Sequence, residues 1–166
     1  MRKLLIGAAL VALVLPVSAC GGGSSKNSEA EQAVQRQADL YQIDQVERTF
    51  HRAGSTHNVN LMMSLWAPGA TFNIGTNTYT GRAQIRKFFT ENPAFQARNH
   101  WESDTPAYKV RITVNGDKGT LYFECHYIDV KTGKAMAVVG VDHNVQKING
   151  KWLIVSGSGS PATLSQ

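Results

Sequence analysis

The sequence predicts an α+β domain in which helices come first and an antiparallel sheet follows. Between about Ser28 and Ala53, apolar residues recur at steps of three and four, which is the spacing of a helix with one buried face. Beyond Tyr108, apolar and polar residues alternate, and Asn-Gly pairs separate the alternating runs. We therefore expect three N-terminal helices to pack in a curved antiparallel sheet that the second half forms.

The first half contains stop and cap signals for these helices. Gly54 ends the first helical run, and Asn58 or Asn60 can cap the second helix. We expect a helix over 28–53 and a short helix through 61–66 that ends at Pro68-Gly69. A strand over 71–74 should follow and pair, after the Gly75 turn, with a strand that contains Tyr79. The third helix should start at Thr80 or Gly81, carry Ile85, Phe88 and Phe89 on one face, and end at Pro93.

Consecutive hairpins account for the second half. Asn115-Gly116, Lys131-Thr132-Gly133 and Asn149-Gly150 are turn sequences. They separate strands that we expect over 108–114, 120–130, 135–148 and 151–155. Three hairpins in series predict an antiparallel sheet of at least four strands.

The N-terminus has the pattern of a secretion signal. Two basic residues precede an apolar run from Leu4 to Val17, which is shorter than the roughly 20 residues of a membrane-spanning helix. The segment Val17-Ser18-Ala19-Cys20 resembles a bacterial lipobox. This resemblance implies cleavage before Cys20 and lipidation of its thiol with acyl chains such as palmitate. The alternative is plain secretion, with Cys20 left free.

Lipidation would hold the domain at a membrane without spanning it, because two acyl chains give stable anchoring. We therefore expect a protein anchored by lipid at the extracytoplasmic face of the cell membrane. The expected organisation is a signal peptide over 1–19, the lipidated cysteine and a flexible linker over 20–37, the folded domain over 38–157, and a flexible tail over 158–166.

Charge and cysteine content exclude several classes of function. The chain has 17 Lys and Arg against 12 Asp and Glu, and cleavage of the signal leaves 15 basic residues. No basic block of the kind that follows a phosphate backbone is present, so nucleic acid is not an expected partner. Lipidation of Cys20 would leave Cys125 as the only free cysteine, which excludes an intrachain disulfide. We expect Cys125 to be a small buried side chain in the core.

Four short segments carry a resemblance to a known family. They are Leu65-Trp66-Ala67-Pro68-Gly69-Ala70, Tyr79-Thr80-Gly81-Arg82, Asn115-Gly116-Asp117-Lys118-Gly119 and Asn149-Gly150-Lys151-Trp152-Leu153-Ile154. In this order they resemble the SnoaL-like group of the NTF2-like superfamily, over roughly residues 38–155. The resemblance implies a cone, in which a curved sheet wraps around three helices and leaves a pocket at the wide end. Such relatives include dehydratases, isomerases and polyketide cyclases, and also proteins that only bind or assemble, so the fold does not determine the function.

Two histidines are candidates for that pocket. His143 shares a strand face with Val141 and Val145, so its ring should point into the cone. The resemblance implies that His143 occupies the place of an inward aspartate, and that His100 matches a pocket histidine of catalytic members. A neutral imidazole can donate, accept or act as a general base near neutral pH. The alternatives are a core histidine at 143 and a surface histidine at 100.

An apolar pocket with a few polar groups is the expected ligand site, although ordinary core packing is the alternative for each aromatic residue. The residues expected to line it are Trp66, Tyr79, Phe89, His100, Phe123 and His143.

Departures from the family pattern favour binding over catalysis. The stretch 54–60 has Ser and Asn where catalytic relatives carry aspartates, and Gly69 also replaces an aspartate. We therefore expect a tethered, non-catalytic domain that binds a small apolar or amphipathic molecule in its cone. One alternative is a protein-interaction or assembly module. The other is a cofactor-independent dehydratase or isomerase, for which His100 and His143 are the catalytic candidates.

Neither a metal nor a cofactor is expected. The five histidines have no close ligand spacing, and no glycine-rich phosphate loop follows a strand. Glu124 and His126 alternate onto the outer sheet face, where they suit an exposed pair or a homodimer surface.

Overall fold

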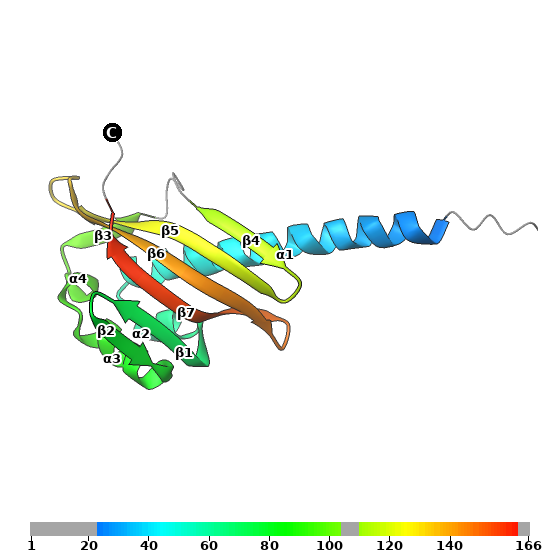
Figure 1. The fold of residues 1–166 in the computed structure, drawn as a ribbon. Helices are drawn as coiled ribbons and strands as arrows, with labels where there is room; N and C mark the ends of the chain where they lie inside the picture. Colours follow the sequence, from blue (N-terminus) through cyan, green and yellow to red (C-terminus); the bar gives the residue numbers. More distant parts are fainter. Residues whose placement is uncertain (1–22, 104–109, 163–166) are drawn as a thin grey trace, which may run out of the picture.

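The computed structural model describes residues 23–103 and 110–162. A helical N-terminal part packs on a curved, open sheet, which confirms the α+β class (Figure 1). The described residues form four helical segments, of which α2 and α4 have only five and four residues, so the expected three helices match only roughly. The elements are α1 (Gly23–Ser55), α2 (Val59–Met63), β1 (Trp66–Ile74), β2 (Asn77–Thr80), α3 (Gly81–Glu91), α4 (Pro93–Gln96), β3 (His100–Ser103), β4 (Arg111–Asn115), β5 (Lys118–Asp129), β6 (Ala135–Ile148) and β7 (Lys151–Pro161).

The sheet is mixed. Its strands follow the order β2-β1-β7-β6-β5-β3, and β4 also pairs with β5. All pairs are antiparallel except β1 with β7, which run parallel. The expectation of a purely antiparallel sheet is therefore wrong at this pair. Turn sequences predict only hairpins between strands that are neighbours in sequence, and the β1–β7 pair joins opposite ends of the domain.

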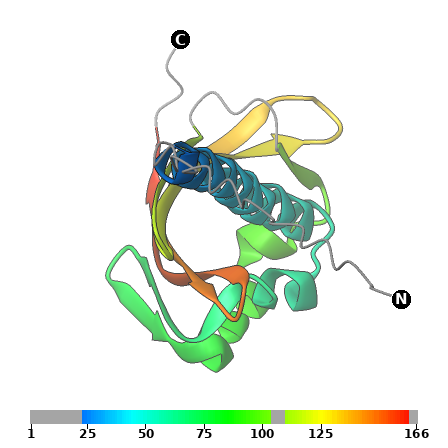
Figure 2. The same cartoon turned by 90° about the vertical axis from the view of Figure 1, so that its right-hand side faces the viewer.

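The sheet bends around the space that the helices occupy, as Figure 2 shows in a view nearly along α1. Trp152 on β7 donates from Nε1 to Oδ1 of Asp39 on α1 at 3.0 Å, and Lys147 on β6 forms an ion pair with the same carboxylate. Burial alone would raise the pKa of Asp39, but hydrogen bonds from Lys147, Trp152 and Gln35 and the Lys147 charge hold that pKa below its ordinary value. These contacts fix α1 against β6 and β7.

Helix α1 is longer than expected. It begins at Gly23, its residues 28–37 are all exposed, and its N-terminal part projects beyond the sheet (Figure 1). Residues 23–27 therefore extend the helix that we expected from residue 28, inside the stretch 20–37 that we expected to be a linker. None of the helices in the described residues is both long and apolar enough to cross a membrane. The signal segment and Cys20 lie outside the described residues.

The local turn and cap signals are confirmed. Asn149 and Gly150 both have positive φ, at 51° and 76°, as the tightest hairpin turns require. The side chain of Asn58 accepts a hydrogen bond from the backbone N–H of Leu61 at 2.9 Å and so caps α2. Strand β3 lies between the predicted helix that ends at Pro93 and the first predicted strand over 108–114, where we expect no strand.

Strand β7 extends through the first four residues of the segment that we expected to be a tail. Ser158 lies opposite Asp142 of β6 on one side and Asn73 of β1 on the other, and the strand continues to Pro161. Residues 158–161 are thus part of the middle of the sheet. Gly157 allows β7 to pass close to the core, because a Cβ atom there would lie 2.5 Å from Cδ2 of His143.

Candidate functional site

His143 lies in the core within a shell of rings. Its ring centroid is 5.3 Å from that of Phe123 and 5.6 Å from those of both Phe50 and Trp66. Neither ring nitrogen has a hydrogen-bond partner among the described residues. Burial lowers the pKa of His143 to about 3, so the ring is neutral at neutral pH.

His100 begins strand β3 and has a different set of neighbours. Its ring centroid lies 5.3 Å from those of His57 and Tyr127. Burial is the main cause that lowers the pKa of His100, and nearby His57 adds to it, whereas a hydrogen bond with the backbone of Ala97 acts in the opposite direction. Within the described part of the chain, no ring contact joins His100 to His143. The structure does not bring the two candidate histidines together as a contacting pair.

The other expected pocket residues divide between two places. Trp66, Phe89 and Phe123 are at most 4% exposed and pack in the same core cluster as His143. Tyr79 lies on β2, half-buried, next to Phe88. The first group therefore fills the inside of the cone, while Tyr79 reaches its surface.

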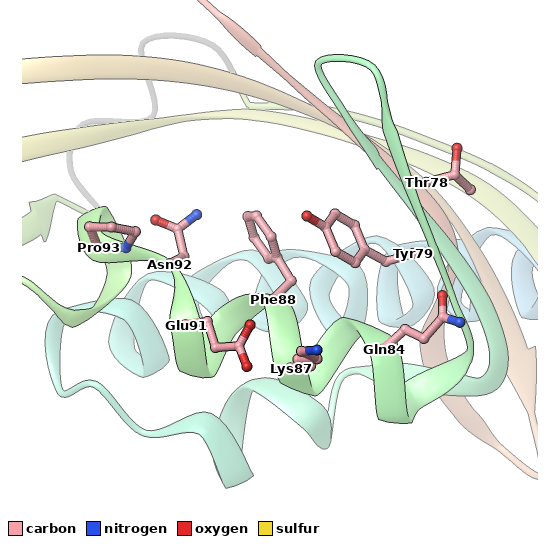
Figure 3. Close-up of a pocket in the computed structure, with 8 residues that line it drawn as sticks. All are labelled: Thr78, Tyr79, Gln84, Lys87, Phe88, Glu91, Asn92 and Pro93. Atoms are coloured by element: carbon pink, nitrogen blue, oxygen red, sulfur yellow. The ribbon is translucent and has the colours of Figure 1, made fainter.

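An aromatic cleft of about 650 Å³ lies between β2 and α3. Figure 3 shows the rings of Tyr79 and Phe88 directed into the same space, and their centroids are 5.0 Å apart. Polar and charged side chains surround these two rings, so the cleft has a small aromatic wall within a polar rim. The full lining is Thr78, Tyr79, Gln84, Lys87, Phe88, Glu91, Asn92 and Pro93.

A buried polar cluster, which the sequence analysis missed, connects α1 to the sheet. Glu47, His51 and Glu102 are each at most 3% exposed. Nδ1 of His51 lies 2.8 Å from Oε1 of Glu47, and its Nε2 lies 3.2 Å from the carbonyl oxygen of Glu124. Both neighbours are acceptors, and Nδ1 is at ion-pair distance from Glu47 without forming a hydrogen bond.

Glu102 is the member of this cluster with the most altered acidity. Burial raises its pKa to about 7, although the charge of His51 and a hydrogen bond from Tyr127 act to lower it. Its backbone is tied to α1, because Ser55 Oγ donates to the carbonyl oxygen of Glu102 at 2.7 Å and accepts from its N–H at 3.1 Å. The carboxyl group is therefore held in place and can change protonation near neutral pH.

His51 and Glu102 also line a second pocket, which we call the side pocket. It has a volume of about 400 Å³ and lies where α1 passes β3, the end strand of the sheet order. Its lining residues are Gln45, Arg48, His51, Arg52, Ser55, Thr56, Trp101 and Glu102. The described residues contain no group of three or more His, Cys, Asp and Glu side chains that could hold a metal ion.

One sequence signal could have pointed to the cluster. His100 and Glu102 are two residues apart, so in a strand they lie on one face, and Trp101 lies on the other. Glu47 and His51 are four residues apart on α1, next to the apolar positions Val46 and Phe50. Polar residues beside an apolar stripe usually face water, and only the long-range packing shows that these do not.

The curved sheet around a helical core, with clefts at its rim, defines a small cone-shaped domain of the cystatin-like, NTF2-like class. The family model described as SnoaL-like domain matches residues 46–154, which is more than half of the chain. The chain belongs to the SnoaL-like family. Among curated proteins, no sequence matches this chain.

Solved structures agree on the fold. An NTF2-like protein with a cystatin-like fold from Novosphingobium aromaticivorans is 17% identical, with a TM-score of 0.68 over 87% of this chain and 94% of that one. A protein of unknown function with a cystatin-like fold from Nostoc punctiforme is 19% identical, with a TM-score of 0.65 over 76% and 93%. A putative dehydratase of the NTF2-like family from Streptomyces avermitilis is 16% identical, with a TM-score of 0.59 over 76% and 98%. At these identities the likeness shows the fold alone.

Proposed function

We propose that this protein is a SnoaL-like domain, anchored by lipid at the extracytoplasmic membrane face, that binds a small apolar or amphipathic molecule without catalysis. The observation that carries the proposal is the aromatic cleft. Its volume of about 650 Å³ suits a small ligand, and Tyr79 and Phe88 provide an apolar wall. Lys87 and Glu91 on the same helix suit the polar end of an amphipathic ligand.

The cleft is continuous with the rings of the core. The ring centroid of Phe88 lies 5.2 Å from that of Phe72, which lies 5.3 Å from Trp66, which in turn lies 5.6 Å from His143. Trp66 and His143 thus support the wall that a ligand would contact. This arrangement favours ligand binding at the cleft, with the packed rings of the core behind it.

The surroundings of the two histidines support binding rather than acid–base chemistry. The ring contacts of His143 are with apolar rings, and no carboxylate is among the contacts described for it. An imidazole that exchanges protons with a substrate needs a partner that orients it and tunes its pKa. His100 lies beside His57 and Tyr127 and so does not supply that partner.

Substitution of the cleft rings tests the binding proposal. In the full chain in detergent, Phe88→Ala should weaken binding of the amphipathic dye anilinonaphthalene sulfonate about tenfold, because the ring supplies much of the apolar wall. Tyr41→Ala is the matched control, since Tyr41 is an exposed aromatic residue on α1, outside the cleft. Fluorescence titration measures the affinities, and equal affinities in both variants would refute a ligand site in the cleft.

The anchor has a separate test. The apolar run of the signal segment followed by Cys20 supports lipidation at that thiol. Cys20→Ser should abolish incorporation of radiolabelled palmitate and move the protein from the membrane to the soluble fraction. Cys125→Ser is the control, because that thiol is buried in the domain. Label that persists in Cys20→Ser would contradict the proposed anchor.

A further inference from the structure

Strand β2 ends the sheet on one side, and among the described strands it pairs only with β1. The two-residue turn Gly75-Thr76 joins these strands, and Ile74 with Asn77 is the pair that closes it. Such a closing pair exchanges hydrogen bonds, and along the ladder hydrogen-bonded pairs then alternate with pairs that are not hydrogen-bonded. The backbone N–H and C=O groups of Thr78 therefore point away from β1.

The next outward-facing position of the strand supports this orientation. The N–H of Thr80 donates to Oε1 of Gln84 at 2.7 Å, so it too is turned away from β1. The hydroxyl of Thr78 donates to Oδ1 of Asn73 at 2.7 Å, but no hydrogen bond joins the backbone N–H or C=O of Thr78 to another described residue. Because Thr78 is exposed, one donor and one acceptor are accessible at the edge of β2.

This edge borders the aromatic cleft. Thr78 and Tyr79 both line the cleft, and Figure 3 shows their side chains on opposite sides of β2, with the Tyr79 ring directed toward Phe88. A strand added to the edge would follow the same alternation. In an antiparallel strand, the residue opposite Thr78 would point outward, and the residue before it would lie opposite Tyr79 with its side chain in the cleft.

The charges of the cleft favour an uncharged chain over a free acid or amine. Lys87 and Glu91 both line the cleft, and neither belongs to an ion pair within the described part of the chain. Their charges cancel, so the lining has no net charge to attract a carboxylate or an ammonium group. An internal peptide segment has an uncharged backbone, and each of its residues supplies one donor and one acceptor.

We propose that the ligand of the aromatic cleft is a short extended peptide segment that adds a strand to β2. One residue of this peptide donates from its N–H to the carbonyl oxygen of Thr78 and accepts from the Thr78 N–H. The preceding residue is apolar and packs on Tyr79 and Phe88. This inference rests on the proposed function, because it names the class of ligand that the cleft binds.

Displacement of anilinonaphthalene sulfonate from the full chain in detergent tests the inference on the unaltered protein. The probe is the peptide acetyl-Leu-Thr-Ala-amide, whose threonine would lie opposite Thr78 and whose leucine would enter the cleft. Methylation of the threonine nitrogen removes the donor to Thr78 and should weaken binding at least about fivefold, which corresponds to one hydrogen bond. Methylation of the alanine nitrogen is the matched control, since that N–H would point away from β2, and the affinity should change by less than about twofold.

Two substitutions at position 78 test the edge from the side of the protein. Thr78→Pro removes the backbone N–H, and an edge strand accepts proline where the N–H is outside the ladder. Thr78→Ala keeps this N–H, and both variants lose the hydroxyl that donates to Asn73. Thr78→Pro should bind the probe at least about fivefold more weakly than Thr78→Ala, whereas the two variants should bind the dye equally.

Three results would overturn the inference and still leave the cleft as a ligand site. They are no displacement of the dye by the probe at millimolar concentration, equal affinities of the two methylated probes, and equal affinities of the two Thr78 variants for the probe. The second would mean that the leucine side chain alone is recognised. The proposed function fails by a different result, namely equal dye binding by Phe88→Ala and Tyr41→Ala.

Discussion

Gly157 lies where β7 passes closest to the core histidine. A Cβ atom there would lie 2.5 Å from Cδ2 of His143 and 3.1 Å from Cη2 of Trp66. Both side chains are held by surrounding rings, so they cannot move aside without strain. Gly157→Ala should therefore lower the free energy of unfolding by roughly 1–3 kcal/mol, the usual cost of overpacking a core. Denaturant unfolding followed by circular dichroism measures the change.

Gly159 is the matched control in the same strand. The nearest atom to a Cβ at Gly159 is 3.5 Å away, which is ordinary contact. Gly159→Ala should be neutral, or stabilise by less than about 1 kcal/mol through the unfolded chain. Equal effects of the two substitutions would show that strand propensity, rather than the approach to His143, decides the cost.

Individual residues were predictable where the pattern is local. Strand alternation predicts that His143 faces the same side as Val141 and Val145, and all three are buried. Glu102 and His51 were not found, because their burial depends on contacts across the fold. The ring of His51 reaches the backbone of Glu124, 73 residues away, and no local pattern reports such a contact.

At the scale of elements, β7 is the strand that joins the two ends of the domain. Its residues from 156 onward pair with β1 in parallel and with β6 in antiparallel register. A chain that stops after Val155 should lose its cooperative thermal transition, because β1 would keep only its Trp66–Ile154 pairing with β7 and lose the four pairs from Thr71 to Ile74. A chain that stops after Ala162 is the control and should melt as the full protein does. A normal transition in the shorter chain would mean that β1 docks without β7.

The turns between elements were predictable from the sequence, whereas the start of α1 and the end of β7 were not. The turns at Gly75, Gly116, Gly133 and Gly150 all have positive φ, as glycine there predicts. The helix before residue 38 was partly missed because Ser, Gly and Lys at its start resemble a linker, although the Glu, Ala and Gln residues that follow are good helix formers. A serine- and glycine-rich strand such as the end of β7 resembles a tail for the same reason.

For the whole molecule, the class of fold was predictable but one connection was not. Hairpins are encoded by turn residues between neighbouring strands, and the predicted β5–β6 and β6–β7 pairs are confirmed. The parallel pairing of β1 with β7 depends on how the sheet curves around the helices, so it follows from packing and not from any one segment.

Two buried groups give the stability of the whole molecule opposite dependences on pH. The pKa of His143 is about 3 in the folded protein and about 6.5 in the unfolded chain, so stability is lost as pH falls from about 6.5 toward 3. The pKa of Glu102 is about 7 folded and about 4.5 unfolded, so stability is lost as pH rises from about 4.5 toward 7. Between about pH 4.5 and 6.5 the two effects oppose each other, which predicts a plateau.

Substituting either group should leave a free energy of unfolding whose pH dependence comes from the other group. His143→Leu should leave a free energy of unfolding that falls as pH rises from about 4.5 to 7, and Glu102→Gln should leave one that rises from about pH 3 to 6.5. Each slope should approach about 1.4 kcal/mol per pH unit where one proton separates the folded and unfolded states. Urea unfolding at a series of pH values measures these curves. If both variants kept the plateau, its origin would lie in the surface charges rather than in these two buried side chains.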